Sequence, residues 1–308
     1  MVNTSARKAN TFRKGAPPLG YLRENIFWFA HPVYFAKTVF ESGDVQFSFL
    51  TLYSPMKFRE EWFNDDDFWE QYAPVMFDEK RWAEVPQVVD SLVNLAGLTA
   101  QKNKASRILD LCCGFGRITL ELSRRGFAAC GVDITAAYLA AAREDAAHEG
   151  LDTTFIQSDV RIFKRKNTFD AALNLYNSFG FFQKPGDDLL FLRNARYSLR
   201  AGGTLIIDLQ GKELAVRDYT EAEWFERAGF TVLTETMPVD SWGSFWNRWV
   251  LLKDGTRREK VFIQRLYSAT ELRSLLLAAG FSSVELYGGW DKRPYDQNAD
   301  TLIAVSRS

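Results

Sequence analysis

The feature that most constrains the fold is a regular alternation of short apolar segments and helix-forming segments between residues 107 and 209. Strand-like runs recur along this stretch, beginning with "RILDL" at 107–111 and continuing with "AACGVDI", "TTFIQSD", "FDAALNL" and "TLIIDL". Helix-forming segments such as "RITLELSRRG" and "TAAYLAAAREDAAHEG" separate several of them. Strands that alternate with helices at this spacing indicate a parallel sheet covered by helices on both faces.

Polar side chains stand at or near the ends of four successive strands, namely Asp110, Asp133, Asp159 and Asn174. Ligands of such sheets bind outside the carboxyl ends of the strands, where the strand order reverses. The sequence therefore predicts a ligand site built from these residues.

The turn after the first strand limits the kind of ligand. Its run Gly114-Phe-Gly116-Arg-Ile-Thr119 departs from the dinucleotide fingerprint at the third small position. Asp110, four residues before the first glycine, would repel a pyrophosphate but attract a free amino group. Asp133 suits the two hydroxyls of a ribose. These residues favour a nucleoside with an amino-acid tail and disfavour NAD.

Two adjacent cysteines, Cys112 and Cys113, precede the glycines, and they could be a redox pair, metal ligands or small wall residues. Neighbouring cysteines rarely bridge, because a disulfide between them strains the backbone. The remaining cysteine is Cys130, and neither His31 nor His148 is close in sequence, so the usual zinc spacing is missing. Small wall residues are therefore favoured, and no metal site is predicted.

With these residues in view, the chain resembles the class I S-adenosylmethionine-dependent methyltransferases. "DLCCGFG" is similar to their first motif, D/E-x-x-x-G-x-G, and "GVDI" to their ribose-binding strand end. "QSDV" resembles the adenine loop, "NLYNSFGFF" the fourth motif and "LRAGGTLIID" the turn into strand five, with Ala201 where proline is usual. "YSATELRSLLLAAGFSSVELYG" resembles the late helix and sixth strand, so the likeness extends over roughly residues 60–308.

The resemblance implies a doubly wound, Rossmann-like, mostly parallel seven-stranded sheet and S-adenosylmethionine as cofactor. Asp133 would bind the ribose, Asp159 the adenine amino group and Asn174 the methionine amino group, while Val160 would pack on the adenine ring. The full set of expected cofactor-binding residues is Asp110, Cys112, Cys113, Gly114, Gly116, Asp133, Ile134, Asp159, Val160 and Asn174.

Two segments outside the motifs are expected to complete the site. In the family, a helix before the first strand often covers the cofactor, and residues 62–82 are the expected cover, with Tyr72 or Arg81 reaching the methionine carboxylate. Residues 211–265 alternate polar and apolar with period two and contain the hairpin signal Asp254-Gly255, which predicts an antiparallel β insertion over the active site. Candidate acceptor-binding residues are Tyr72, Tyr176, Trp242 and Arg248.

The expected domain organisation follows from these segments. It comprises a disordered tail at 1–20, an aromatic-rich extension and cover at 21–104, a methyltransferase core at 105–210 and 266–308, and the β insertion at 211–265. Within the extension, "DVQFSFLTLYS" alternates like a strand.

Composition limits the partners. Lys plus Arg (38) nearly equals Asp plus Glu (39), so the net charge of −1 gives no basic field for nucleic acid or a membrane surface. No apolar run is long enough to span a bilayer, and the first residues lack the apolar core of a signal peptide. A cytoplasmic location is the default expectation, and the oligomeric state is open.

The leading expectation for activity is N- or O-methylation of a small molecule. The alternatives are a protein or RNA methyltransferase and a non-catalytic regulator that binds S-adenosylmethionine. No catalytic base is assigned, because neither histidine is convincingly placed.

Overall fold

The computed structural model describes residues 61–100 and 105–308 in full, together with the backbone of the strand segments 35–41 and 44–50. The chain divides into two compact units, Met1–Lys57 and Phe58–Ser308. The predicted domain boundaries stay predictions, and the tail predicted at 1–20 lies outside the described residues.

In the smaller unit, β1 (Phe35–Glu41) and β2 (Asp44–Leu50) pair antiparallel, with Phe35 opposite Leu50. β2 falls within the segment whose alternation is typical of a strand.

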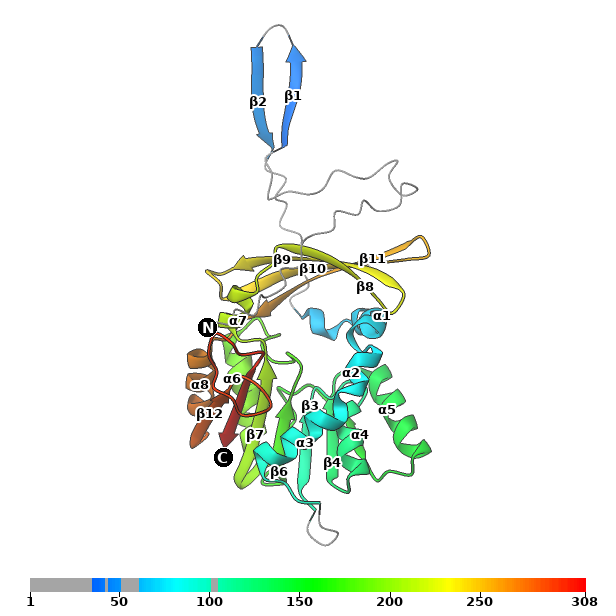
Figure 1. Ribbon diagram of the computed structural model, residues 1–308, viewed down its shortest axis with the longest axis vertical. Coiled ribbons are helices and arrows are strands. Elements are labelled where there is room, and N and C mark those ends of the chain that lie inside the picture. The colour runs from blue at the N-terminus through cyan, green and yellow to red at the C-terminus, as the bar shows by residue number, and fades with distance from the viewer. Residues whose placement is uncertain (1–34, 42–43, 51–60, 101–104) are drawn as a thin grey trace, which may run out of the picture. The chain divides into compact units, whose positions relative to one another are not determined.

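The larger unit is built on a seven-stranded sheet with strand order β12-β13-β7-β6-β3-β4-β5 (Figure 1). Its neighbours pair parallel from β7 to β5, whereas β13 is antiparallel to both β7 and β12. The strands are β3 (Arg107–Leu111), β4 (Ala128–Asp133), β5 (Thr154–Gln157), β6 (Phe169–Asn174), β7 (Leu199–Leu209), β12 (Ser283–Tyr287) and β13 (Leu302–Arg307).

Helices cover both faces of this sheet because successive strand residues point to opposite sides. Ile108 packs in one buried cluster with α3 and α4, whereas Leu109 packs in another with α6 and α8. The helices of this layer are α3 (Val85–Ala96), α4 (Arg117–Arg124), α5 (Ala136–His148), α6 (Pro185–Ser198) and α8 (Ala269–Ala278). The predicted fold class is confirmed.

The strand order reverses at β3, which lies between β4 and β6. After β3 the chain adds β4 and β5 on one side, then crosses back to place β6 on the other. The carboxyl ends of β3, β4 and β6 therefore surround the switch point, where open α/β sheets bind ligands.

A second sheet, with order β11-β10-β9-β8, is entirely antiparallel and confirms the predicted β insertion. Figure 1 shows it on the side toward which the parallel strands point. Asp254 and Gly255 form the two-residue turn between β10 and β11, both with positive φ (48° and 74°), as the hairpin signal predicts. The strands are β8 (Ala222–Arg227), β9 (Phe230–Val239), β10 (Ser244–Lys253) and β11 (Thr256–Arg265), preceded by α7 (Lys212–Arg217).

Aromatic side chains join this antiparallel sheet to the short elements that precede α3. These elements are η2 (Trp62–Asn64), α1 (Asp66–Met76) and α2 (Glu79–Ala83). Their buried cluster, called the aromatic cluster below, has as its fully buried members Trp62, Phe63, Phe68, Tyr72, Val75, Val232, Leu251 and Phe262.

Tyr72 is the central side chain of the aromatic cluster. It is fully buried, stacks on Phe68 with ring centres 5.0 Å apart, and donates its hydroxyl hydrogen to the carbonyl of Trp249 in β10 (2.9 Å). Among the helices of the described residues, none has the length and apolar character needed to cross a bilayer.

Replacing Tyr72 with phenylalanine tests the link between α1 and β10. The change deletes one buried hydrogen bond, so the free energy of unfolding should fall by about 1 kcal/mol in urea titrations. Tyr197→Phe is the control, because Tyr197 is 45% exposed and its loss should cost less than about 0.5 kcal/mol. Equal effects of the two changes would contradict the role given to Tyr72.

Candidate active site

The turn after β3 is the centre of the site, and its backbone is left-handed at three of five positions. Cys112, Gly114 and Gly116 have φ values of 61°, 54° and 72°. The N–H of Cys113 donates to the carbonyl of Val132 in β4 (3.1 Å), and the N–H of Gly116 donates to the carbonyl of Cys113 (2.9 Å). The turn is thereby fixed against the neighbouring strand before α4 begins.

The glycine positions are also places of close approach. A Cβ on Gly116 would lie 2.7 Å from the ring of Phe155, and one on Gly131 would lie 2.7 Å from the sulfur of Cys113. Positive φ and this crowding both exclude larger residues at Gly116. Cys113 fits because Gly131 opposite it has no side chain.

The cysteines are free thiols, with Cys112 and Cys113 half-buried. Burial and the neighbouring carboxylates raise the pKa of both thiols well above the ordinary value. Because the thiolate is the reactive and metal-binding form, protonated thiols here act as small packing groups. Among residues 61–100 and 105–308, no cluster of three or more His, Cys, Asp or Glu side chains is arranged to hold a metal.

Asp133 joins the ends of β4 and β3. One carboxylate oxygen accepts from the N–H of Gly114 (2.8 Å) and the other from the N–H of Thr135 (2.9 Å). The residue is 8% exposed, and burial raises its pKa. Each carboxylate oxygen keeps a second lone pair, so the group can still accept from two ligand hydroxyls.

Asp110 is buried at the end of β3 and accepts a hydrogen bond from the Thr119 hydroxyl (2.6 Å). Burial raises the pKa of Asp110 to about 7, against the lowering effect of that bond. Thr119 is the residue that breaks the dinucleotide fingerprint, and its hydroxyl supports the buried acid.

Asn174, at the end of β6, has an unused acceptor. Its amide nitrogen donates to the carbonyl of Leu111 (3.1 Å), while its Oδ1 is buried with no hydrogen-bond partner within the described part of the chain. An unsatisfied buried acceptor beside the switch point suits the amino group of an amino-acid ligand. The donor and acceptor groups at these strand ends thus fit an amino-acid nucleoside.

The loop after β5 holds Asp159, Val160 and Arg161. Asp159 accepts from the guanidinium of Arg161 (2.6 Å) and from the Arg161 backbone N–H (2.7 Å), so this carboxylate already has partners. Val160 is buried and Ile134 is half-buried. Adenine contact by these residues stays a prediction.

Tyr176 and Asn177, which follow β6, are both left-handed, with φ of 57° and 62°. Such backbone is strained for residues other than glycine and persists where neighbours hold it. Asp208 does so, because its carboxylate accepts from the Tyr176 N–H (3.2 Å) and its carbonyl from the Asn177 N–H (3.2 Å). Burial raises the pKa of Tyr176, so its hydroxyl is not a base at neutral pH.

Two residues of this region were not predicted from the sequence, Asp208 and Arg117. Asp208 stands near the end of the strand "TLIIDL", one residue before Leu209, and positions near strand ends also identified Asp110 and Asp133. Arg117 directly follows the glycines, is only 5% exposed, and lies 4.8 Å from the ring centre of Tyr176. No sequence pattern marks an arginine as buried.

Other predicted acceptor-binding residues have structural partners of their own. Tyr72 belongs to the aromatic cluster, as described above. Trp242 packs edge-on against Tyr219, with ring centres 5.3 Å apart. Arg248 pairs with Glu235 (2.9 Å) and Glu259 (2.7 Å) on the two neighbouring strands. Acceptor contact by these three residues stays a prediction.

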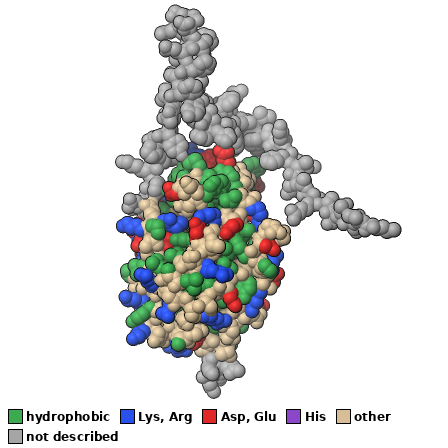
Figure 2. Space-filling model, turned by 90° about the vertical axis from the view of Figure 1, so that its left-hand side faces the viewer, with side chains coloured by type: hydrophobic (Ala, Val, Ile, Leu, Met, Phe, Trp, Pro, Cys, Tyr) green, Lys and Arg blue, Asp and Glu red, His purple; other side chains and the backbone are tan. Residues whose placement is uncertain are grey.

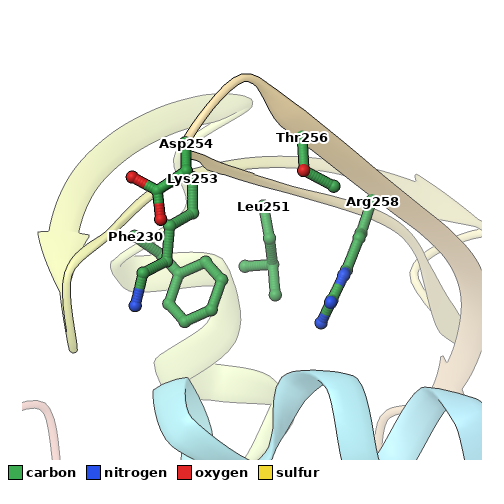
Figure 3. Close-up of a pocket in the computed structure, with 6 residues that line it drawn as sticks. All are labelled: Phe230, Leu251, Lys253, Asp254, Thr256 and Arg258. Atoms are coloured by element: carbon green, nitrogen blue, oxygen red, sulfur yellow. The ribbon is translucent and has the colours of Figure 1, made fainter.

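A cavity of about 280 Å³ opens at the far end of the β10–β11 hairpin (Figure 3). Lys253 lies 4.7 Å over the ring of Phe230 at one side of it. The lining consists of Phe230, Leu251, Lys253, Asp254, Thr256 and Arg258. None of the predicted cofactor residues contributes to this cavity.

Comparisons with known proteins agree with this geometry. A family described as "Methyltransferase domain" matches residues 108–203. The ubiquinone biosynthesis O-methyltransferase of Nitrosococcus oceani is 39% identical over 89 residues, which are 27% of this chain and 38% of that protein. The glycine/sarcosine N-methyltransferase of Halorhodospira halochloris is 27% identical over 221 residues, 67% of this chain and 76% of that one.

Among solved structures, the CcbJ methyltransferase from Streptomyces caelestis superimposes with a TM-score of 0.63 at 18% identity, covering 72% of this chain and 88% of that chain. Residues 108–203 therefore match a methyltransferase domain, and the larger unit has the fold of a solved methyltransferase, which agrees with the predicted resemblance to the class I S-adenosylmethionine-dependent methyltransferases. The cofactor of this class is S-adenosylmethionine. The match to the ubiquinone enzyme spans well under two thirds of that protein's length.

Asp133→Ala tests the ribose assignment. Loss of charged hydrogen bonds worth about 1.5–3 kcal/mol each should weaken S-adenosylhomocysteine binding by roughly two to three orders of magnitude in calorimetry. Asp133→Asn is the control, since its amide oxygen can still accept from Gly114 and preserve the turn. Unchanged affinity in a folded Asp133→Ala protein would show that the acid only supports the turn.

Asp110→Asn tests whether the buried carboxyl lowers stability at high pH while it contributes to ligand binding. The folded-state pKa of Asp110, about 7, lies above its ordinary value of 3.8, so ionising the buried group opposes folding as pH rises from about 4 to 7. The variant should therefore be more stable than the wild type at pH 8, by roughly 2 kcal/mol, and not at pH 4. It should also bind S-adenosylhomocysteine about tenfold more weakly at pH 8. A stability difference between the variant and the wild type that does not change with pH would contradict the raised pKa of Asp110.

Proposed function

We propose that this chain transfers the methyl group of S-adenosylmethionine to a nitrogen or oxygen atom of a small molecule. The observation that carries the proposal is the aromatic cluster. In it, side chains from residues 62–76, from the fourth-motif loop at 174–182 and from the antiparallel sheet pack together. The ring centre of Phe181 in this loop lies 4.8 Å from that of Trp62, and the ring centre of Phe182 lies 5.3 Å from that of Phe63. A wall of packed aromatic rings suits a small acceptor bound beside it, because the wall excludes water.

Hydrogen bonds tie the loop to the sheet. The N–H of Arg265, the last residue of β11, donates to the carbonyl of Gly180 (2.8 Å), and the side chain of Gln264 donates to the carbonyl of Asn177 (3.2 Å). A polymer substrate would need an open groove in place of these contacts. They support an enclosed acceptor site.

The distribution of charged side chains also supports a small-molecule acceptor. Lys and Arg side chains intermingle with Asp and Glu side chains on the face shown in Figure 2. Together with a net charge of −1, this favours a small acceptor over a nucleic acid, which is bound mainly through basic residues.

The chain's own contribution to transfer is orientation. When bound, the cofactor supplies a methyl group on a sulfonium, which is an intrinsically good leaving arrangement. Asp133, Asp110 and Asn174 would hold the ribose and the amino group at the strand ends. Tyr176 and Asn177, fixed by Asp208, would form the wall on the acceptor side. Positioning of this kind lowers the barrier without a base when the attacking atom is unprotonated.

The relatives' names are consistent with either attacking atom. One is named for O-methylation in ubiquinone biosynthesis and the other for N-methylation of glycine or sarcosine. Glycine and sarcosine, the acceptors named for the second relative, are small molecules.

A metabolite screen that detects S-adenosylhomocysteine formation tests the proposal, followed by Phe181→Ala on the acceptor found. Loss of the half-buried ring should lower kcat/KM at least tenfold while S-adenosylhomocysteine affinity changes less than about threefold, because only acceptor orientation is lost. Trp224→Ala is the control, since Trp224 is 63% exposed and should leave both values unchanged.

Two results would overturn the proposal. Turnover of peptides or RNA but of no metabolite would indicate a polymer acceptor. Cofactor binding with no turnover of any substrate class would indicate a regulator.

A further inference from the structure

Arg117 is a buried cation to which the described part of the chain offers no ionic partner. It is 5% exposed, and within residues 61–100 and 105–308 it forms no ion pair. Its Nη1 donates a hydrogen bond to the backbone carbonyl of Arg81 in α2. Buried charges are normally paired, because an unpaired charge loses its hydration without compensation.

The position of Arg117 in its helix adds to this cost. Arg117 is the first residue of α4, where the helix dipole favours negative charge and disfavours a cation. Its guanidinium lies over three aromatic rings, 4.8 Å from the centre of Tyr176, 5.3 Å from Phe77 and 5.9 Å from Trp82. These rings hold the group in place, but they do not neutralise it.

Arg117 and the two acceptors at the strand ends match the two ends of an amino acid. Asp110 is close enough for the two charges to influence each other, although they form no ion pair. Asp110 and the unsatisfied Oδ1 of Asn174 are acceptors suited to an ammonium group, and Arg117 is the donor suited to a carboxylate. The zwitterionic end of methionine carries both groups on one carbon.

We propose that Arg117 binds the carboxylate of the methionine part of S-adenosylmethionine and thereby makes the site selective for a cofactor that carries this carboxylate. The inference rests on the cofactor assignment. Arg81, the arginine predicted for this role from the sequence, is a weaker candidate, because its side chain is 48% exposed and already pairs with Glu84 (3.1 Å). Through its backbone carbonyl, Arg81 instead positions Arg117.

The test compares two probes by calorimetry, S-adenosylhomocysteine and S-adenosyl-3-thiopropylamine, which keeps the amino group but lacks the carboxylate. The wild type should bind the first roughly 30- to 100-fold more tightly, as expected for a charge-assisted pair. Arg117→Met keeps most of the side-chain volume. Its affinity for S-adenosylhomocysteine should fall by this roughly 30- to 100-fold factor, and its affinity for the decarboxylated probe should change less than about threefold.

Two arginines serve as controls. Arg124→Met, on the same helix but paired with Glu149 at the surface, should leave both affinities unchanged. Arg81→Met should not remove the preference between the probes, since its carbonyl remains. If Arg81→Met abolishes the preference and Arg117→Met does not, Arg81 binds the methionine carboxylate and the proposal is wrong.

The remaining outcomes separate this inference from the cofactor assignment. If the wild type binds neither probe, the assignment of S-adenosylmethionine as cofactor is refuted. A wild type that binds both probes equally would refute the role of Arg117 without any variant. Equal weakening of both probes by Arg117→Met would show a structural role only. Should that variant not fold, Arg117→Lys, which keeps the charge but not the planar fork, should retain only part of the preference.

Discussion

The structure of the site depends on the hydrogen bond from Gly114 to Asp133, which joins the ends of two neighbouring parallel strands. The bond requires the chain to turn left-handed immediately after β3, and that turn requires glycine where Phe155 crowds the backbone. Once the turn is fixed, α4 begins at Arg117, and Thr119 reaches back to Asp110. The strand ends, the helix start and the buried acid therefore form one unit.

The same region carries groups that a stable core would avoid. Asp110 is buried with a raised pKa, Arg117 has no ionic partner within the described residues, and the Oδ1 of Asn174 has no donor. Each costs stability in the unliganded protein. A ligand with an ammonium group and a carboxylate would satisfy all three, which explains why the costs are concentrated at the switch point and not spread over the core.

Much of this arrangement could be predicted from the sequence, because strand ends follow from local alternation and parallel strands end at one edge. Asp110, Asp133 and Asn174 were found in this way. The partners of Arg248 could not be found, since Glu235 and Glu259 become its neighbours only through strand register. The hydrogen bond from Tyr72 to β10 could not be predicted either, because the contact of α1 with β10 is set by tertiary packing. The burial of Arg117 likewise depends on α2 and the fourth-motif loop.

The most direct test of the account is a calorimetric titration of the full chain with S-adenosylhomocysteine and, separately, with NADH. The acid at Asp110, the hydroxyl at Thr119 and the acceptors at Asp133 and Asn174 predict S-adenosylhomocysteine binding with a Kd of about 1 μM or tighter, roughly −8 kcal/mol, and no NADH binding. Binding of NADH without binding of S-adenosylhomocysteine would contradict the account.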